Sequence, residues 1–185
     1  MISYNKSKII LKKSKIKLGE EFINTNKCLN RVTSKNIYVL SYYPLGDNAA
    51  FDGYAIKSSD TYRLNKKISK KFKIIGSIAA GNKPIKKKIK KFQTIEIMTG
   101  ALIPKPFDTI IPIEQINFLP DKKNAKYILI NKRIPKFEHV RFKGSDYKKG
   151  DLLIPKGTIL ESNHILALKT LGIKKIKVKK KPNVL

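Results

Sequence analysis

Short apolar runs, rich in Ile, Tyr and Phe and separated by turn residues, dominate the middle of this chain of 185 residues. Runs of this length and composition are typical of β-strands, and the prolines between them are too frequent for a helical period to survive. The pattern predicts strands over residues 53–56, 72–78, 94–98, 109–113 and 126–130. We therefore expect residues 49–137 to form a small β-barrel or β-sandwich.

The segments on either side have a mixed pattern. Before the β segment we expect a short helix over residues 9–13, a strand over 21–23 and a helix that begins at Asn24 or Thr25, since both residue types cap helices. After it, the pattern predicts a strand over 151–154, a helix that begins at its N-cap Ser162 with Gly172 just past its end as a C-cap, and an extended segment from residue 173 to Pro182. This helix should pack against the N-terminal stretch. The fold class is then α+β, with residues 1–48 and 138–185 forming one mixed α/β region and residues 49–137 inserted in it.

The composition favours a folded protein without a membrane segment. Hydrophobic residues make up 41% of the chain, enough for one ordinary domain or two small ones. No apolar run approaches the roughly 20 residues that a membrane span needs, and the polar N-terminus does not resemble a secretion signal. Cys28 is the only cysteine, and its apolar neighbour Leu29 indicates a buried thiol in a reducing, cytoplasmic environment.

The formal net charge of +28 raises the possibility of a nucleic-acid partner, since clustered lysines release counterions from a phosphate backbone. However, only four of the 41 basic residues are arginines: Arg31, Arg63, Arg133 and Arg141. A bias towards Lys, Ile and Asn is what an AT-rich genome produces on any solvated surface, whereas base-specific readers favour arginine. We therefore expect a solvated surface. A Lys-rich β protein that binds nucleic acid or anionic surfaces nonspecifically is kept as the alternative.

Common catalytic signatures are missing from the sequence. His139 and His164 have neither the spacing nor the acidic companion of a helical zinc site, and no glycine-rich nucleotide-binding loop appears. Asp and Glu number only 13. Five aspartates lie near glycine, proline or another turn residue, where Asp is often purely structural: Asp47, Asp52, Asp108, Asp146 and Asp151. When each of these aspartates is considered alone, we interpret it as a turn residue.

The order of several short blocks changes that interpretation. Residues 47–56 read Asp-Asn-Ala-Ala-Phe-Asp-Gly-Tyr-Ala-Ile, and residues 97–104 read Ile-Met-Thr-Gly-Ala-Leu-Ile-Pro. Asp-Thr-Ile-Ile-Pro-Ile-Glu follows at 108–114, and Val-Arg-Phe-Lys-Gly-Ser-Asp-Tyr-Lys-Lys-Gly-Asp at 140–151. In this order the blocks resemble the molybdopterin molybdenumtransferases, the family of MoeA and the gephyrin E domain. The corresponding family signatures begin Asp-Asn-Ser-Ala-Met-Asp-Gly-Tyr-Ala and Ile-Met-Thr-Gly-Ala-x-x-Pro.

The resemblance implies a fold and a reaction. In the family, an elongated N-terminal region (domain I) carries an inserted β domain (domain II). Domain I matches residues 1–48 together with 138–185, and domain II matches residues 49–137. Family members convert adenylylated molybdopterin and molybdate, with Mg²⁺, into molybdenum cofactor and AMP. Their active cleft is completed across a homodimer, so we expect small-molecule substrates and a homodimer. The family's C-terminal α/β and β domains are absent, so we expect a fragment or truncated product that is inactive alone.

The resemblance also implies site residues. Catalytic roles fall on Asp52, Thr99 and Asp146. Asp52 and Asp146 are the expected Mg²⁺ ligands, because Mg²⁺ takes oxygen ligands from a few carboxylates and substrate phosphate. Thr99 and Gly100 are expected to offer a hydroxyl and an N–H to an oxyanion, although this glycine also suits a strand-end turn. Substrate-binding or supporting roles fall on Asp47, Asn48, Gly53, Tyr54 and Gly100.

The sequence also departs from the family pattern. Ala49, Phe51, Ser145 and Asn30 replace the usual Ser, Met, Glu and Gly. Ala49 thereby removes a hydroxyl that is able to form a hydrogen bond. A scaffold role, such as gephyrin adds to its enzyme domain, is a further alternative, for which the sequence offers no receptor-binding feature.

Overall fold

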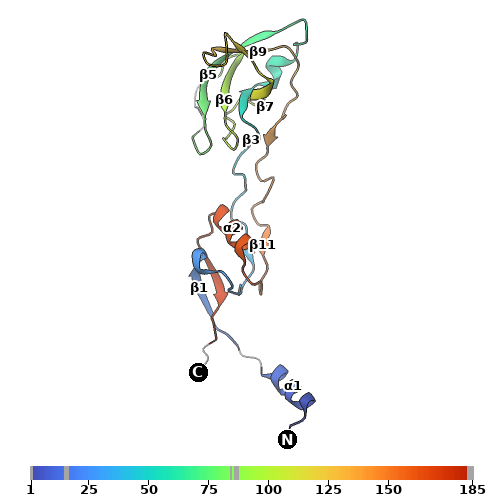
Figure 1. Cartoon of the computed structure of the whole chain (residues 1–185), viewed down its shortest axis with the longest axis vertical. Helices are drawn as coiled ribbons and strands as arrows, with labels where there is room; N and C mark the ends of the chain where they lie inside the picture. The colour runs from blue at the N-terminus through green and yellow to red at the C-terminus, as the bar shows by residue number, and fades with distance from the viewer. Residues whose placement is uncertain (1, 15–16, 84, 86–87, 183–185) are drawn as a thin grey trace. The chain divides into compact units, whose positions relative to one another are not determined.

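The computed structural model of the chain describes residues 2–14, 17–83, 85 and 88–182. The chain divides into two compact units: Met1–Leu40 with Lys149–Leu185, and Ser41–Lys148 (Figure 1). The described residues form two α-helices and twelve β-strands, which confirms the α+β class. The second unit is inserted within the first along the sequence. The second unit runs from Ser41 to Lys148, whereas the sequence pattern predicted an inserted segment over residues 49–137.

Two pairs of antiparallel strands hold the first unit together. The paired strands are β1 with β12 and β2 with β11, with bounds Glu20–Asn24, Lys175–Lys179, Ile37–Tyr38 and Leu152–Ile154. The core of this unit includes Leu160, Leu168 and Cys28, all fully buried. The buried thiol expected at Cys28 is thus confirmed, and burial raises the pKa of this thiol because it disfavours the thiolate.

The helices of the first unit begin and end at residues that satisfy their backbone groups. Helix α1 (Tyr4–Lys13) starts earlier than the sequence pattern predicted, and Ser3 caps it by accepting the N–H of Lys6 at 3.4 Å. The helix expected at Asn24 or Thr25 is a single 3-10 turn, η1 (Thr25–Lys27), with Asn24 as its cap. None of the helices among the described residues is long and apolar enough to cross a membrane.

Helix α2 (Ser162–Thr170) packs against η1, as expected, but its N-cap is Glu161 and not Ser162. The backbone N–H of Glu161 donates to Nδ1 of His164 at 3.1 Å, so the imidazole accepts one of the N–H groups at the start of the helix. At the other end the C-cap is Leu171, and Gly172, with a φ of 70°, donates its N–H to the carbonyl of Lys169 at 3.0 Å. The expected glycine in the left-handed conformation just past the helix is thus confirmed.

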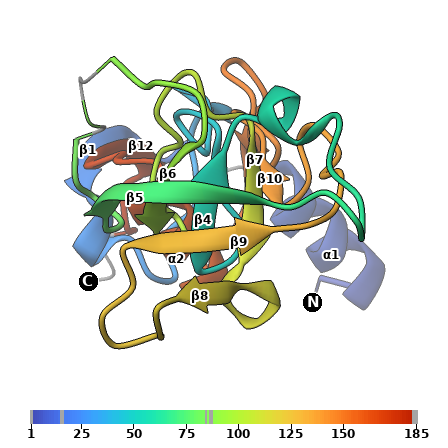
Figure 2. The ribbon, with the colours of Figure 1, turned by 90° about the horizontal axis from the view of Figure 1, so that it is seen from above.

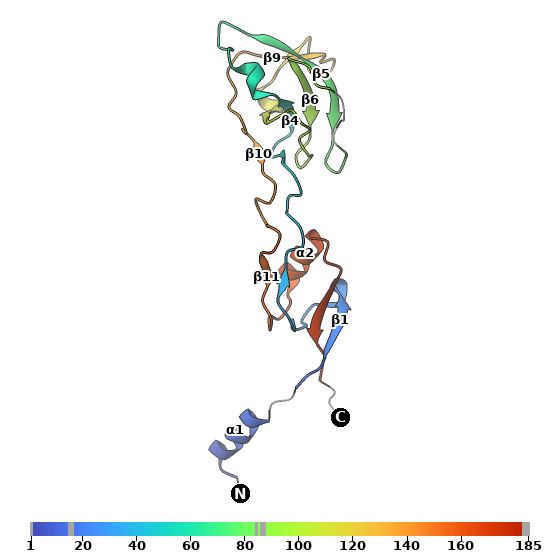
Figure 3. The same cartoon turned by 180° about the vertical axis from the view of Figure 1, so that it is seen from behind.

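A six-stranded mixed sheet forms most of the second unit, in the order β7-β4-β6-β5-β9-β8. Their bounds, in sequence order, are Gly53–Ile56 (β4), Lys70–Ile78 (β5), Gln93–Ile97 (β6), Thr109–Pro112 (β7), Asn117–Leu119 (β8) and Tyr127–Ile130 (β9). All five predicted strands are present, with small shifts at their ends. Figure 2 shows β5 and β9 running across the direction of β4 and β7, so the sheet curls into a half-barrel; Figure 3 shows it from behind.

Both faces of this sheet are covered, because alternate side chains of the same strand enter different clusters. Ala55, Ile95 and Ile110 belong to one buried cluster, whereas Tyr54 and Ile111 belong to the other. The two short strands β3 (Asn48–Ala49) and β10 (Val140–Arg141) form a separate antiparallel pair in this unit. The sheet therefore has no solvated face along β4 and β7, and its strands are fixed relative to one another by packing on two sides.

Gly53 stands where β4 and β7 come closest. A Cβ atom on this residue would lie 2.0 Å from the carbonyl oxygen of Ile111, a backbone atom that has no room to move within the sheet. The glycine is therefore required by the close approach of two strands.

We predict that Gly53→Ala destabilises the chain by at least about 2 kcal/mol, because overpacking a filled interior forces the backbone apart. The measurement is the guanidinium unfolding curve of the purified chain. Gly19→Ala is the matched control, since a Cβ there would meet only the flexible Lys180 side chain at 3.4 Å. Equal unfolding midpoints for the two variants would show that the strand contact at Gly53 is not tight.

Candidate functional site

The centre of the candidate site is the contact between Asp52 and Thr99. Antiparallel pairing sets Gly53 at the start of β4 opposite Ile97 at the end of β6, so the residues just outside these strands meet at one end of the pair. Oδ1 of Asp52 accepts hydrogen bonds from the N–H of Thr99 at 2.7 Å and from its hydroxyl at 2.6 Å. The backbone carbonyl of Asp52 accepts the N–H of Ile113 at 3.0 Å, which fixes the turn from the other side.

These hydrogen bonds favour the ionised form of the exposed Asp52 carboxylate. The Thr99 hydroxyl and then the Thr99 N–H hold the pKa of Asp52 below its ordinary value, because both donate to the charged form. Both also donate to Oδ1. No described residue donates to Oδ2 of Asp52, so this oxygen is available to a cation or to a donor on a substrate.

A second set of hydrogen bonds joins the two motif loops directly. Gly100 adopts a φ of 81°, a conformation that favours glycine, and its N–H donates to the carbonyl of Ala49 at 2.8 Å. The N–H of Ala49 donates in return to the carbonyl of Ala101 at 3.0 Å. The N–H of Gly100 and both donors of Thr99 are therefore used inside the chain. That these groups donate hydrogen bonds to a substrate oxyanion stays a prediction.

Asp47 and Asn48 connect the first motif to the segment around residue 141. Oδ1 of Asp47 accepts the N–H of Lys143 at 2.9 Å, and Asn48 lies opposite Arg141 in the β3–β10 pair. Asn48 is only 7% exposed, and within the described part of the chain its Oδ1 has no hydrogen-bond partner. A buried carbonyl oxygen of this kind is costly to leave unpaired, so it is a candidate acceptor for a ligand or a water molecule.

Asp146 lies in a different set of contacts. Its carboxylate forms an ion pair with Arg141 and accepts the hydroxyl of Ser145 at 3.1 Å, while its N–H donates to the carbonyl of Tyr43 at 3.1 Å. Among the described residues no hydrogen bond or ion pair joins this group to the Asp52–Thr99 pair. The structure thus brings Asp52 and Thr99 together, and it brings Asp146 to Arg141.

A magnesium ion is compatible with this arrangement only through very few protein ligands. The described residues include no group of three or more His, Cys, Asp or Glu side chains that is arranged to hold a metal ion. Mg²⁺ is commonly bound by one or two carboxylates, with water and substrate phosphate completing its shell. Asp52, with one oxygen fixed by Thr99 and the other without a donor, fits that pattern.

The other expected supporting residues lie in the sheet. Tyr54 is 4% exposed and packs edge-on against Phe118, with ring centroids 5.8 Å apart. Burial, and to a lesser degree Glu96, raises the pKa of Tyr54, so its hydroxyl stays protonated. Tyr54 and Gly53 therefore help to position β4, which Asp52 directly precedes.

Sequence reasoning missed the contribution of two residues to this region. Arg141 was part of a recognised motif, but its pairing with Asp146, five positions away, was not anticipated. His139 was weighed only as a zinc ligand. Its carbonyl accepts the N–H of Ala50 at 3.0 Å and its ring lies 4.9 Å from that of Phe51, so it packs against the loop that presents Asp52. Its position one residue before the Val-Arg block was the available signal.

Comparison with known proteins gives one family for this chain. The family model described as "MoeA N-terminal region (domain I and II)" matches residues 2–172. Molybdopterin molybdenumtransferase of Staphylococcus aureus (strain Mu50) is 32% identical over 158 residues, which are 85% of this chain and 36% of the relative. The protein of the same name from Staphylococcus epidermidis (strain ATCC 12228) is 31% identical over 162 residues, or 88% of this chain and 37% of the relative.

Solved structures of MoeA proteins have the same fold as this chain. Two structures of the molybdopterin biosynthesis MoeA protein from Pyrococcus horikoshii superpose with TM-scores of 0.82 and 0.81, at 34% and 31% identity. They cover 96% and 95% of this chain, but the matched part is only 44% and 45% of those chains. The chain thus spans less than half the length of these relatives. With the family model matched over residues 2–172, the chain belongs to the MoeA N-terminal region family.

Proposed function

We propose that this chain forms one wall of the active site of a molybdopterin molybdenumtransferase, which inserts molybdate into adenylylated molybdopterin and releases AMP. The observation that carries the proposal is the Asp52–Thr99 pair, in which two donors fix one carboxylate oxygen and leave the other open. The names of the curated relatives support the reaction class. The chain matches about 36% of the length of the first of these relatives, so the proposal gives it one wall of the site and not the whole site.

Asp52 is the proposed ligand of a magnesium ion. Molybdate and the adenylyl phosphate are both anions, and a bound Mg²⁺ supplies the positive charge that lets them approach each other. The role of the chain is to hold the carboxylate in one position. Thr99 does this through Oδ1, and its donors lower the pKa of Asp52 because they favour the charged carboxylate. No rearrangement of the loop is then needed when the cation binds Oδ2.

Asp146 is proposed as a second acidic group whose availability depends on Arg141. In this structure the guanidinium of Arg141 neutralises Asp146. Asn48, whose Oδ1 lacks a described partner, lies opposite Arg141 in the β3–β10 pair and is a proposed acceptor for substrate. Asp47, through the N–H of Lys143, ties the two segments that carry these residues.

We also infer a homodimer and a cytoplasmic location. The dimer follows from the resemblance to a family whose cleft is shared between subunits. A reducing compartment is supported by Cys28, a free, fully buried thiol. The alternative of nonspecific nucleic-acid binding gains no support from the relatives, and it leaves the ordered motifs unexplained.

The assignment of Asp52 predicts a large loss of turnover in Asp52→Asn. The measurement uses a chimaeric protein in which this chain replaces the matching segment of the Staphylococcus aureus relative, assayed with adenylylated molybdopterin and molybdate. Loss of a preorganised charge at a reacting centre typically costs about 10²–10³-fold in turnover. Asp121→Asn is the matched control, because Asp121 is also an exposed aspartate whose pKa local donors lower. Equal turnover of the two variants would remove Asp52 from the site.

The hydrogen bond from the Thr99 hydroxyl also predicts a pH effect. In Thr99→Val the pKa of Asp52 should rise towards its ordinary value, because the largest cause of its depression is lost while the N–H bond remains. A depressed pKa stabilises the fold above the ordinary value, and that contribution is lost as the pH falls through the lowered one. Thr99→Val should reduce this contribution, whereas Thr99→Ser should keep it.

Carbon-detected NMR titration of the aspartate side chains measures the pKa of Asp52 directly in each variant. The titration of Asp121, which depends on Asn124 and Lys123, serves as an internal reference that neither substitution changes. An Asp52 titration curve that is the same in the original chain and in Thr99→Val would contradict the proposed role of the hydroxyl.

A further inference from the structure

A hollow of about 610 Å³ lies in the second unit, at the segment that joins β4 to β5 and at the start of β6. None of its lining residues belongs to the motif blocks described above. Its lining includes the cationic side chains of Arg63, Lys70 and Lys91 and the aromatic rings of Tyr62 and Phe92. Its volume is in the range of sites that hold one small organic molecule.

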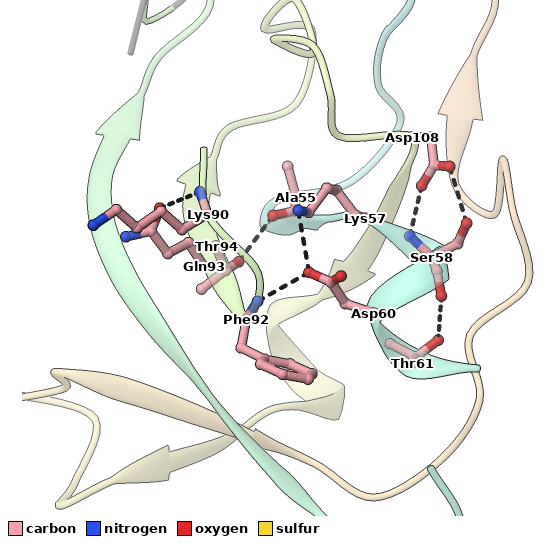
Figure 4. Close-up of polar contacts among 10 residues, drawn as sticks. All are labelled: Ala55, Lys57, Ser58, Asp60, Thr61, Lys90, Phe92, Gln93, Thr94 and Asp108. Carbon is pink, nitrogen blue, oxygen red and sulfur yellow. Dashed lines mark hydrogen bonds and ion pairs between the residues drawn. The ribbon is translucent and has the colours of Figure 1, made fainter. Parts of the chain in front are cut away.

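The single acidic residue in the lining does not balance these cations. Asp60 lies with its side chain only 5% exposed, and its Oδ2 is 3.5 Å from Nζ of Lys57, which is not among the lining residues. The same oxygen accepts the N–H of Phe92 at 2.9 Å (Figure 4). Lys57, which does not line the hollow, thus neutralises the Asp60 carboxylate. The three cations of the lining therefore keep their net positive charge.

Arg63 is exceptional among the arginines of this chain. Arg31 bonds Glu21 and the carbonyl of Lys179, Arg141 pairs with Asp146, and Arg133 stacks on the ring of Tyr62 at 5.0 Å. Arg63 has no hydrogen bond, ion pair or ring contact with any described residue. Lysine provides nearly all of the charge on this surface. A guanidinium that the fold does not use, but that faces a hollow, is suited to a planar, two-point contact with an external oxyanion.

The aromatic walls of the hollow are already in place. Phe92 adopts a φ of 54°, which is unusual for a bulky residue, and Asp60 stabilises this conformation by accepting its N–H. The ring of Phe92 packs edge-on against Phe72, with centroids 5.5 Å apart, and Nζ of Lys70 lies 5.8 Å from its centre. Tyr62 is 67% exposed, so part of its ring is open to contact.

From these features we propose that the hollow binds a small phosphate ester that carries a planar aromatic group. The phosphate contacts Arg63, with Lys70 and Lys91 contributing charge, and the aromatic group lies against Tyr62 and Phe92. Nucleic acid offers the same two chemical groups. The limited volume of the hollow and its single unpaired arginine favour one small molecule over a strand, which needs a groove that tracks its backbone.

Isothermal titration of the full chain with phenyl phosphate tests this proposal. Binding should be saturable and severalfold tighter than that of inorganic phosphate, because the ring adds contact with the aromatic walls. Arg63→Gln should weaken binding by about tenfold or more, as expected when a charged hydrogen-bond donor is removed. Arg63→Lys should give an intermediate loss, since it keeps the charge and loses the fork. Because Arg63 is exposed and has no described partner, both variants should keep the unfolding midpoint of the original chain.

Lys122→Gln is the matched control, because it removes one charge from an exposed loop of the same unit that does not line the hollow. It should change phenyl phosphate binding by less than about twofold, as expected for a distant, screened charge. An equal loss in Arg63→Gln and Lys122→Gln, or equal binding of phenyl phosphate and inorganic phosphate, overturns the proposal. So does displacement of phenyl phosphate by a short oligothymidylate at equal phosphate concentration, which would assign the hollow to nucleic acid.

Discussion

Strand β4 is hydrogen-bonded along both of its edges, to β6 and to β7, and the arrangement of the motif residues depends on this constraint. The approach is so close at Gly53 that no side chain fits there. Because the start of β4 is held beside the end of β6, the turn before β4 meets the loop after β6, and Asp52 reaches Thr99. The carboxylate is therefore fixed on an exposed loop without being buried, and it avoids the cost of desolvating a charge.

Several of the scarce carboxylates of this basic chain hold backbone segments in place. Asp47 accepts a backbone N–H from a residue nearly a hundred positions away, and Asp108 accepts both the N–H and the hydroxyl of Ser58 (Figure 4). Asp60 fixes the start of β6 in the same way through Phe92. The interpretation of single aspartates as structural residues therefore describes Asp47 and Asp108 well. Asp52 accepts a hydroxyl and a backbone N–H of the same residue, Thr99, at one oxygen, and we propose that its second oxygen contacts the cation.

The sequence pattern predicted the longer elements because they repeat a period over enough residues to be detected. The strand at 53–56 has the predicted bounds, and the others differ at their ends by a few residues. Strands of two residues, such as β3 and β10, are too short to show a period, and the pairing of these two joins segments about ninety residues apart. The cap of α2 was misplaced by one residue because His164, which reaches back to Glu161, is not a usual capping side chain. The contact between Asp52 and Thr99 was anticipated only as membership of one site, through the motifs, since local patterns do not encode a hydrogen bond between residues 47 positions apart.

The central claim is that Thr99 fixes Oδ1 of Asp52 and leaves Oδ2 open to a divalent cation. A crystal structure of the chain grown with Mn²⁺ as a magnesium substitute tests it most directly, because the anomalous signal locates the ion without assumptions. The account predicts an ion on Oδ2 of Asp52, with the hydroxyl and the N–H of Thr99 still bonded to Oδ1. An ion bound elsewhere while Asp52 carries none, or a Thr99 hydroxyl turned away from the carboxylate, would contradict it.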